Sequence, residues 1–424
     1  MQRCFALVDG NNFYVSCERV FRPDLWYKPV LVMSNNDGCV VARSAEVKAL
    51  GIKMGTPVFQ IKALIQQHAI VCFSSNYALY ANLSARMINV LEQFAPQVHL
   101  YSIDEAFLDL TGVHACQQDA IAYGLTIKKA IAKQLGLPVC VGIAPTQTLA
   151  KLANYIAKQY PEYQGVVDFN NGALREKLMV DIDVSEVWGV GRQSAAKLKT
   201  LGICSVADLK AQSPKRMQSL LNIQLARIVL ELNGTCCYEE DTSKAQQQVM
   251  CSRTFSRYLT TLSELRCAVS EYAQRAGEKL RQQQLTASNI TVFIRTNPHH
   301  RTEAFYERCA SITLQHPSSD SITLVKSAWC CLERMYKTGK HYHKCGVLLS
   351  GLQATHQAQQ GSLFVDYPQA RHATLMSTID QINQRFPKGI QLASSGFDRS
   401  YLPKTENKSP SYTTNWQQLV RVKT

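Results

Sequence analysis

Three acidic residues are candidates for metal chemistry. Asp9 ends the apolar run CFALVD, and Asp104 and Glu105 are adjacent within YSIDEAFLDL. Neighbouring side chains of a strand point to opposite faces, so this acid pair fits a strand only if the chain turns there or a cation is present. A strand or hairpin edge with solvated acids is the alternative. If the two segments are neighbouring strands, their carboxylates converge, and such hard oxygen ligands favour Mg²⁺.

The composition predicts a folded, basic protein. The chain has 424 residues, 46% of them hydrophobic, which is enough for two to four domains. Residues 249–424 carry 22 Lys and Arg against 11 Asp and Glu, whereas residues 1–248 carry 24 against 21. This bias favours a polyanionic partner, with solubilising charge as the alternative.

Location and redox state can also be inferred from the sequence. We find no run of about 18 apolar residues and no apolar signal-peptide core near the start MQRCFALVDGNN, so we expect a cytoplasmic protein without a membrane partner. The 15 cysteines are scattered and form no paired CxxC arrangement. Reduced thiols are therefore expected rather than disulfides or zinc sites.

The pattern of apolar residues predicts mixed strands and helices in the first half of the chain. Strands are expected to end at Asp9 and to cover 29–33 and 137–144, and helices are expected over 77–94, 120–135 and 148–159. Because these elements show no strict βαβ repeat, a mixed sheet with helices on one face is favoured over a doubly wound fold.

The second half divides by composition. Residues 169–236 predict short helices with the turn GVGRQSAAKLKTLGI, and the polar stretch 237–248 predicts a linker. An α+β domain with a helix over 262–283 is expected next, within 249–352. Residues 353–424 are rich in Gln, Ser, Thr and Pro, and much of this segment is expected to be a flexible tail.

A series of motifs resembles the Y-family DNA polymerases. VDGNNFYVSCE, SAEVKALGIKMG, SNYALY, YSIDEAFLDLTGV, VGIAPTQTLAKLAN and VWGVGRQSAAKLKTLGI occur in the order found in that family. SNNDGCVVARSAE, CFSSNYALYA and SPSYTTNWQQLVRVK are similar to its UmuC branch, the catalytic subunit of bacterial DNA polymerase V. The resemblance covers nearly all of the chain and is loosest over about 355–405.

The resemblance implies an α+β multidomain fold of the right-hand polymerase type, with a mixed-sheet palm and small fingers. It assigns a palm to 1–16 and 75–168, fingers to 17–74, a helical thumb with a helix-hairpin-helix to 169–236, a linker to 237–248, an α+β little finger to 249–352 and a tail with partner-binding segments to 353–424. The implied activity is error-prone translesion synthesis in an SOS-type damage response.

The resemblance also gives the three acids roles. Asp9 and Asp104 would bridge two Mg²⁺ ions, and Glu105 would help to hold the ion on the primer side. The backbone carbonyl of Gly10 would be a further ligand, although family members are expected to carry a bulkier residue there. The ions would promote attack of the primer 3′-hydroxyl on the α-phosphate of a dNTP.

Aromatic and basic residues match the nucleotide-binding positions of the family. Phe13 and Tyr14 would face the incoming sugar, with Tyr14 as the steric gate against a 2′-hydroxyl; core packing is the alternative for both. Lys48 and Lys158 would grip the triphosphate, with ordinary surface lysines as the alternative. Arg43 is expected to replace a tyrosine that many family members carry in the adjacent helix.

DNA and protein partners follow from the same resemblance. In the thumb, Gly189 and Gly191 begin a helix whose N–H groups, with Lys197, would bind a DNA phosphate; a glycine turn without a ligand is the alternative. The segment QGSLF resembles peptides that dock on the β sliding clamp, through Gln360, Leu363 and Phe364. The implied partners are primer-template DNA, dNTP, a processed UmuD-like dimer, the RecA filament and the clamp.

Two other classes of function remain possible from the residues themselves. A non-catalytic DNA-binding scaffold of a repair complex would use the acids only structurally. A two-metal nuclease would use the same acids to activate water, but the aromatic and lysine positions favour nucleotide addition.

Overall fold

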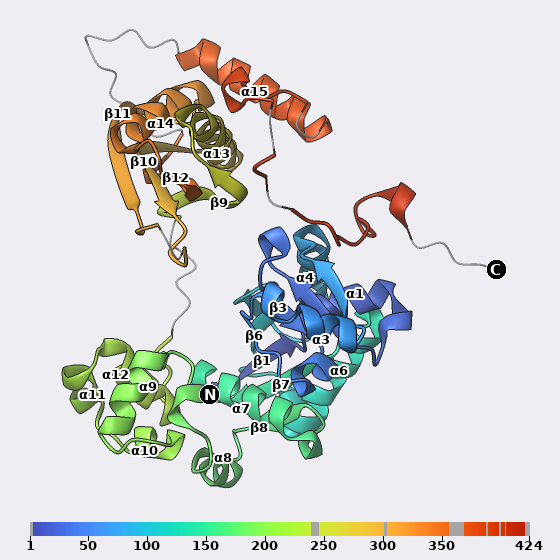
Figure 1. The fold of residues 1–424 in the computed structure, drawn as a ribbon. Helices are drawn as coiled ribbons and strands as arrows, with labels where there is room; N and C mark the ends of the chain where they lie inside the picture. Colours follow the sequence, from blue (N-terminus) through green and yellow to red (C-terminus); the bar gives the residue numbers. More distant parts are fainter. Residues whose placement is uncertain are drawn as a thin grey trace. The chain divides into compact units, whose positions relative to one another are not determined.

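The chain folds into two compact units. The computed structural model describes residues 3–238, 246–300, 303–355, 369–386, 389–397, 400–402 and 404–419. The first unit comprises residues 1–241 together with 406–424, and the second comprises 242–405 (Figure 1). The chain therefore passes from one unit to the other twice. Most of the expected linker 237–248 lies outside the described residues.

A five-stranded sheet forms the centre of the first unit. Its order is β5 (Gln97–Leu100), β6 (Glu105–Asp109), β1 (Phe5–Gly10), β7 (Val139–Ala144) and β8 (Val166–Asp168). All neighbouring strands are antiparallel except β7 and β8, which are parallel. Every residue of β1 and β7 is buried, so both faces of the sheet must be covered.

Helices cover both faces of this sheet. Phe5 and Leu7 of β1 pack with α7 (Gln147–Gln159) on one face. The alternating residues Ala6 and Val8 pack on the other face, together with several helices. That set consists of α1 (Phe13–Phe21), α4 (Tyr77–Leu91), the short α5 (His114–Gln118) and α6 (Ala120–Leu135). The expected mixed sheet and the helices over 120–135 and 148–159 are confirmed, but the expectation of helices on one face was wrong, because the continuous apolar runs of β1 and β7 need cover on two sides.

A small three-stranded sheet lies in the same unit. Its order is β3 (Val40–Arg43), β2 (Val30–Met33) and β4 (Val71–Ser74), with α2 (Ala45–Ala49) and α3 (Lys62–Gln67) beside it. β2 pairs antiparallel with β3 and parallel with β4. The Ser44 hydroxyl accepts a hydrogen bond from Val47 N–H and caps α2. Gly51, at φ +75°, follows shortly after this helix.

Five short helices continue the first unit. They are α8 (Gly172–Met179), α9 (Arg192–Thr200), α10 (Val206–Lys210), α11 (Pro214–Leu220) and α12 (Ile223–Leu232). They share one apolar core with α7. The fully buried carboxylate of Glu231 accepts hydrogen bonds from Thr148 N–H at 3.1 Å and from Cys237 N–H at 2.6 Å. This charge-assisted contact joins α12 to the start of α7.

The second unit is an antiparallel sheet with two long helices. The strands are β9 (Gln248–Leu259), β10 (Leu285–Thr296), β11 (Glu307–Ser318) and β12 (Tyr342–Ala354), in the order β11-β10-β12-β9. Helices α13 (Leu262–Gln282) and α14 (Ser321–Met335) pack against the sheet and share its core (Figure 1). Thr261 and Glu264 form a capping box at the start of α13, where the sequence predicted a helix.

The described parts of the tail differ from the expected flexible segment. They include α15 (Gln369–Arg385), in which Asp380 accepts two hydrogen bonds from Arg281 at 2.6 and 2.8 Å. Tyr401 is buried in the core of the second unit, and residues from 406 onwards belong to the first unit. These residues are ordered by tertiary partners, which the polar composition of the tail cannot reveal.

All fifteen cysteines are free thiols. Among the described residues, no helix has the length and apolar character needed to cross a membrane.

We predict that Gly142→Ala will destabilise the first unit. Gly142 lies in β7, where an added Cβ would overlap the backbone N of Asn154 and the carbonyl O of Ala150 in α7. Such overpacking should lower the free energy of unfolding by about 1–3 kcal/mol. Gly172→Ala is the control, because its Cβ would meet only the Arg175 guanidinium, at 3.9 Å. Urea unfolding followed by circular dichroism would contradict the prediction if both variants kept the wild-type midpoint.

Candidate active site

The five-stranded sheet brings the three acids together. β1 and β6 are antiparallel neighbours, and their register pairs Asp9 with Glu105. Asp104 lies in the turn immediately before β6, and its carbonyl accepts the Gly10 N–H at 2.8 Å. The segment YSIDEAFLDL is therefore not one strand, because the chain turns between β5 and β6. This turn allows the adjacent acids to lie at the same end of the sheet as Asp9.

Two lysines neutralise part of the acidic charge. Lys158 Nζ lies 2.6 Å from Asp9, and Lys151 Nζ lies 2.9 Å from Glu105. Burial raises the pKa of Asp9 to about 7, against the attraction of the Lys158 ammonium, and a hydrogen bond with Glu105 also raises it. Burial acts to raise the pKa of Glu105 too, but that hydrogen bond and the Lys151 ammonium lower it overall. The two neighbouring carboxyls therefore shift each other's pKa in opposite directions.

The acidic residues fit a metal that takes few protein ligands. In the described ranges, no group of three or more His, Cys, Asp or Glu side chains is placed to hold a metal ion. Mg²⁺ does not need such a group, because it usually keeps waters and is held by one or two carboxylates plus substrate phosphates. Asp9 is buried and Glu105 is partly buried, and with Asp104 alongside they form a place where a divalent cation can offset the carboxylate charges.

Sequence reasoning did not identify Lys151. Its ammonium pairs with Glu105 and lies 4.2 Å from the ring centroid of Tyr101 and 5.5 Å from that of Trp188. The Trp188 indole N–H donates to the Tyr101 hydroxyl at 2.9 Å. Lys151 and Lys158 are seven residues apart in α7, a spacing that places them on one helix face. This seven-residue spacing from Lys158 was the sequence signal that could have identified Lys151.

The predicted sugar-facing aromatics begin α1. Asn12 adopts φ 49° and starts this helix directly after β1. Phe13 is buried against Gly10, where an added Cβ would lie 2.8 Å from the Phe13 ring, which accounts for the glycine at this position. Tyr14 is half-buried and stacks on the buried Tyr80, with ring centroids 4.4 Å apart. The Tyr14 ring is thus supported from behind while part of it remains accessible.

The predicted basic residues lie near the acids. Burial and the charges of Arg43 and Lys158 lower the pKa of Lys48, whereas Asp9 acts to raise it. The positive charges of three residues therefore lie close enough to interact. They are Lys48 in α2, Arg43 at the end of β3 and Lys158 in α7. Such a cluster of positive charge could hold a polyphosphate.

The predicted thumb residues surround a helix N-terminus. Gly189 has φ +91°, and an added Cβ would lie 2.9 Å from the Ile228 side chain. Gly191 is the N-cap of α9, and no heavy atom lies within 4 Å of the position of its missing Cβ. Lys197 is exposed on the same helix. The backbone N–H groups of this turn could bind a phosphate.

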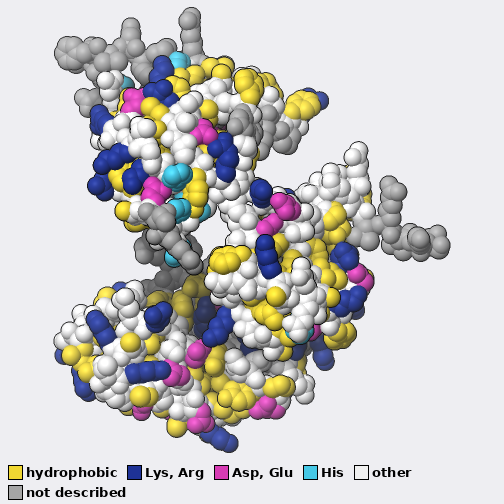
Figure 2. Space-filling view, in the orientation of Figure 1, with side chains coloured by type: hydrophobic (Ala, Val, Ile, Leu, Met, Phe, Trp, Pro, Cys, Tyr) yellow, Lys and Arg dark blue, Asp and Glu magenta, His cyan; other side chains and the backbone are white. Residues whose placement is uncertain are grey.

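The second unit is basic. Residues 249–352 carry 14 Lys and Arg against 7 Asp and Glu, and the face visible in Figure 2 shows more Lys and Arg than acidic side chains over this unit. The residues expected to bind the clamp, Gln360, Leu363 and Phe364, lie outside the described residues.

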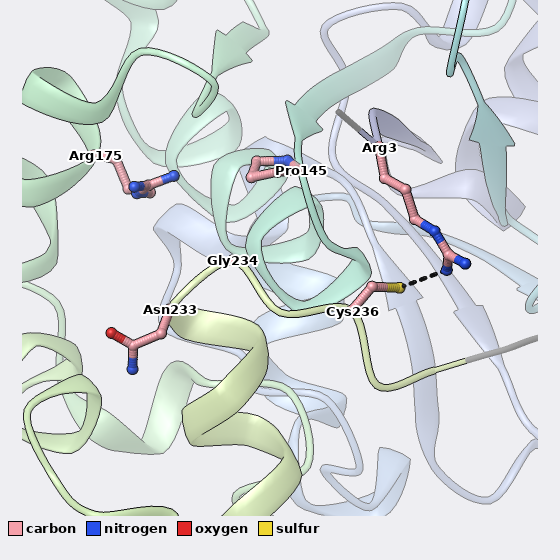
Figure 3. A pocket seen from close by; sticks show the side chains of 6 residues that line it. All are labelled: Arg3, Pro145, Arg175, Asn233, Gly234 and Cys236. Atoms are coloured by element: carbon pink, nitrogen blue, oxygen red, sulfur yellow. Dashed lines mark hydrogen bonds between the residues drawn. The ribbon is translucent and has the colours of Figure 1, made fainter. Parts of the chain in front are cut away.

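A cavity of about 550 Å³ lies in the first unit. Its lining residues are Arg3, Pro145, Arg175, Asn233, Gly234 and Cys236 (Figure 3). The Arg3 guanidinium points toward Cys236 and donates a hydrogen bond to its sulfur at 3.3 Å. None of the three acids lines this cavity, so the candidate reaction site lies elsewhere, at the end of the sheet that carries the acids.

The chain is similar to known proteins along most of its length. The impB/mucB/samB family model matches residues 8–155, and the model of that family's C-terminal domain matches 246–363. A domain of unknown function matches 373–422. Protein UmuC of Salmonella typhimurium is 44% identical over 99% of this chain and 100% of its own length. DNA polymerase IV 1 of Bacillus subtilis is 28% identical over 96% of this chain and 95% of its own.

Solved structures give the same fold. A chimeric Y-family DNA polymerase based on Dbh has a TM-score of 0.66 and 22% identity, covering 83% of this chain and 99% of its own. The α+β fold is therefore that of the right-hand DNA polymerases. The chain belongs to the impB/mucB/samB family and is a UmuC-like Y-family translesion DNA polymerase. Divalent metal use follows from this membership in general terms.

We predict that Ser102→Ala will weaken the use of Mg²⁺. The Ser102 hydroxyl donates a hydrogen bond to the Asp104 carboxylate and fixes its orientation in the turn. Loss of this bond should raise the Mg²⁺ concentration for half-maximal primer extension by about fivefold, or about 1 kcal/mol. Ser102→Thr keeps a hydroxyl and should restore most of the wild-type value. An unchanged Mg²⁺ requirement in Ser102→Ala would contradict the role given to this residue.

Proposed function

We propose that this translesion polymerase adds dNMPs to a primer 3′-end by two-magnesium nucleotidyl transfer, as an error-prone enzyme of an SOS-type damage response. The observation that carries the proposal is the convergence of Asp9, Asp104 and Glu105 at one end of the sheet, beside the two lysines of α7. A scaffold would gain nothing from bringing carboxylates together at a partly buried position, where repulsion and desolvation cost free energy.

The three acids and the Gly10 carbonyl would hold the two ions. When bound, Mg²⁺ would neutralise the triphosphate and lower the barrier to attack of the 3′-hydroxyl on the α-phosphate, with pyrophosphate leaving. Asp9 would then no longer need Lys158 as its counter-ion. The Lys158 ammonium, together with Lys48 and Arg43, would supply positive charge to the phosphates.

Tyr14 would act as the steric gate of this site. Tyr14 lies in the first turn of α1 and its ring is held against Tyr80, so the ring cannot easily move aside. A ribose 2′-hydroxyl would collide with such a fixed ring, whereas a deoxyribose would fit. Buried Phe13 would contribute by packing below the sugar.

We assign the parts of the fold to the subdomains of a right-hand polymerase. The five-stranded sheet with its helices is the palm, the three-stranded sheet the fingers, α8 to α12 the thumb, and β9 to β12 with α13 and α14 the little finger. Gly189, Gly191 and Lys197 would bind primer-template phosphates, and the basic second unit would contact the duplex backbone.

The remaining partners extend this proposal. A processed UmuD-like dimer, the RecA filament and the β sliding clamp would act with the chain, the clamp through Gln360, Leu363 and Phe364. The place of action would be the cytoplasm, at the nucleoid during DNA damage.

We predict that Asp104→Asn will abolish primer extension. The substitution removes a ligand charge, so extension past a template lesion with Mg²⁺, dNTPs and the partner proteins should fall by about 10³-fold or more. Asp109→Asn is the matched control, because Asp109 lies at the far end of β6 and accepts a hydrogen bond from Thr111 N–H. Equal extension by wild type and Asp104→Asn would contradict the proposal, as would shortening of the labelled primer in place of extension.

We also predict that Tyr14→Ala will admit ribonucleotides. Removing the ring should raise the efficiency of rNTP insertion relative to dNTP insertion by about tenfold or more, which corresponds to about 1.4 kcal/mol. Single-nucleotide insertion kinetics on an undamaged template measures this ratio. Tyr123→Ala, on α6, is a suitable control because the Tyr123 hydroxyl donates to Phe94 O, away from the three acids. If Tyr14→Ala kept the wild-type ratio of rNTP to dNTP insertion, Tyr14 would not be the steric gate.

A further inference from the structure

Residues 406–412, near the C-terminus, belong to the first unit and pack on it. Ser74, the last residue of β4, donates its N–H to Asn407 O at 3.0 Å, and its hydroxyl accepts the Asn407 N–H at 3.0 Å. Lys408 forms a parallel bridge with the same serine, so the segment extends the edge of the three-stranded sheet. These residues fall in the region matched by the domain of unknown function.

An aromatic contact fixes the other end of this segment. Tyr412 is buried, and its ring stacks on that of Phe21 in α1 with centroids 4.6 Å apart. The segment 406–412 is therefore held at two points, by a strand-like pairing with β4 and by a stack on α1. Helix α1 is the same helix that carries Tyr14.

Between these two points lies a buried polar network. The Ser409 hydroxyl donates to Glu18 Oε1 at 3.0 Å and accepts a hydrogen bond from Asn76 Nδ2 at 2.9 Å. The Tyr80 hydroxyl donates to the same Glu18 oxygen at 2.7 Å. Glu18 and Tyr80 are fully buried, and Ser409 and Asn76 nearly so. The tail therefore contributes one of the two hydroxyls that hold this carboxylate.

The Glu18 carboxylate depends on these two donors. Burial raises its pKa, and the hydrogen bonds from Tyr80 and Ser409 act against that effect. Among the described residues, its second oxygen, Oε2, has no hydrogen-bond partner. A buried carboxylate with so few donors has little tolerance for losing one, so its position should depend strongly on Ser409.

The network leads directly to the predicted gate. The Tyr80 ring, whose hydroxyl is held by Glu18, stacks on Tyr14 with an interplanar angle of 14°. Glu18 also follows Tyr14 by four residues in α1, a spacing that places both on one side of the helix. Ser409, Glu18, Tyr80 and Tyr14 thus form an unbroken chain of contacts.

We propose that Ser409 is a positioning residue for sugar selection, and that the segment 406–412 is a structural part of the nucleotide site. It acts through Glu18, which holds the Tyr80 ring against Tyr14. The inference rests on the proposed function, because it assigns a means of support to the gate. It gives the C-terminal segment a role within the chain, separate from any partner that the segment binds.

The test compares nucleotide selection in full-length variants. We expect Ser409→Ala to raise the efficiency of rNTP relative to dNTP insertion by about threefold to tenfold. Without the Ser409 hydroxyl, Glu18 would hold the Tyr80 ring less firmly against Tyr14. Ser409→Thr keeps a hydroxyl and should restore most of the wild-type ratio. Ser411→Ala is the matched control: it lies in the same segment, and its hydrogen bond to Gln418 uses the backbone N–H, which the substitution retains.

A double-mutant cycle distinguishes a positioning role of Ser409 from a general loss of stability. In a Tyr14→Ala background, Ser409→Ala should cause no further change in the rNTP to dNTP ratio, because the supported ring is absent. Tyr80→Phe removes the other hydroxyl donor of Glu18 while keeping the stacked ring, so it should relax selection in the same direction. This second variant keeps the inference testable if Ser409→Ala fails to fold.

The outcomes distinguish this inference from the proposed function. A wild-type ratio in Ser409→Ala with a relaxed ratio in Tyr14→Ala would overturn the inference and leave the gate standing. Wild-type ratios in both variants would overturn the inference together with the role of Tyr14. Additive effects of Ser409→Ala and Tyr14→Ala would also overturn it, because the two residues would then act independently.

Discussion

The antiparallel pairing of β1 with β6 is the constraint on which the site depends. It sets Asp9 opposite Glu105, and the turn before β6 adds Asp104. Helix α7 can approach this sheet closely because Gly142 has no side chain at the contact. That approach brings both lysines of α7 to the acids. Backbone pairing and one glycine therefore set the positions of the charged groups.

The charges at this site are balanced internally. Lys158 pairs with Asp9 and Lys151 pairs with Glu105, so two of the three carboxylates have a positively charged partner within the chain. A nucleotide that arrives with divalent ions brings both the cations for the acids and the phosphates for the lysines. The same ion pairs that stabilise the free protein can thus be exchanged for substrate contacts. The accessible end of the sheet supplies the place for this exchange.

Much of this arrangement could be predicted from local sequence patterns. The apolar periodicity identified α6 and α7, and the placement of Asp9, Asp104 and Glu105 indicated where the acids converge. A turn at the acid pair was expected only as one alternative to a bound cation. The alternation of apolar and polar residues does not show where the chain turns. Long-range partners were not predictable: Lys151 contacts Glu105, and Ser409 contacts Glu18 across most of the chain. Such contacts depend on tertiary packing that no local pattern encodes.

The most direct test of the account is the number of Mn²⁺ ions that the protein binds, measured by electron paramagnetic resonance with a dideoxy-terminated primer-template and the next dNTP. The account predicts two nucleotide-dependent ions per chain in the wild type and loss of both in Asp9→Asn, since Asp9 is assigned as a ligand of each. Unchanged binding of two ions by Asp9→Asn would contradict the central claim that these acids form the metal site.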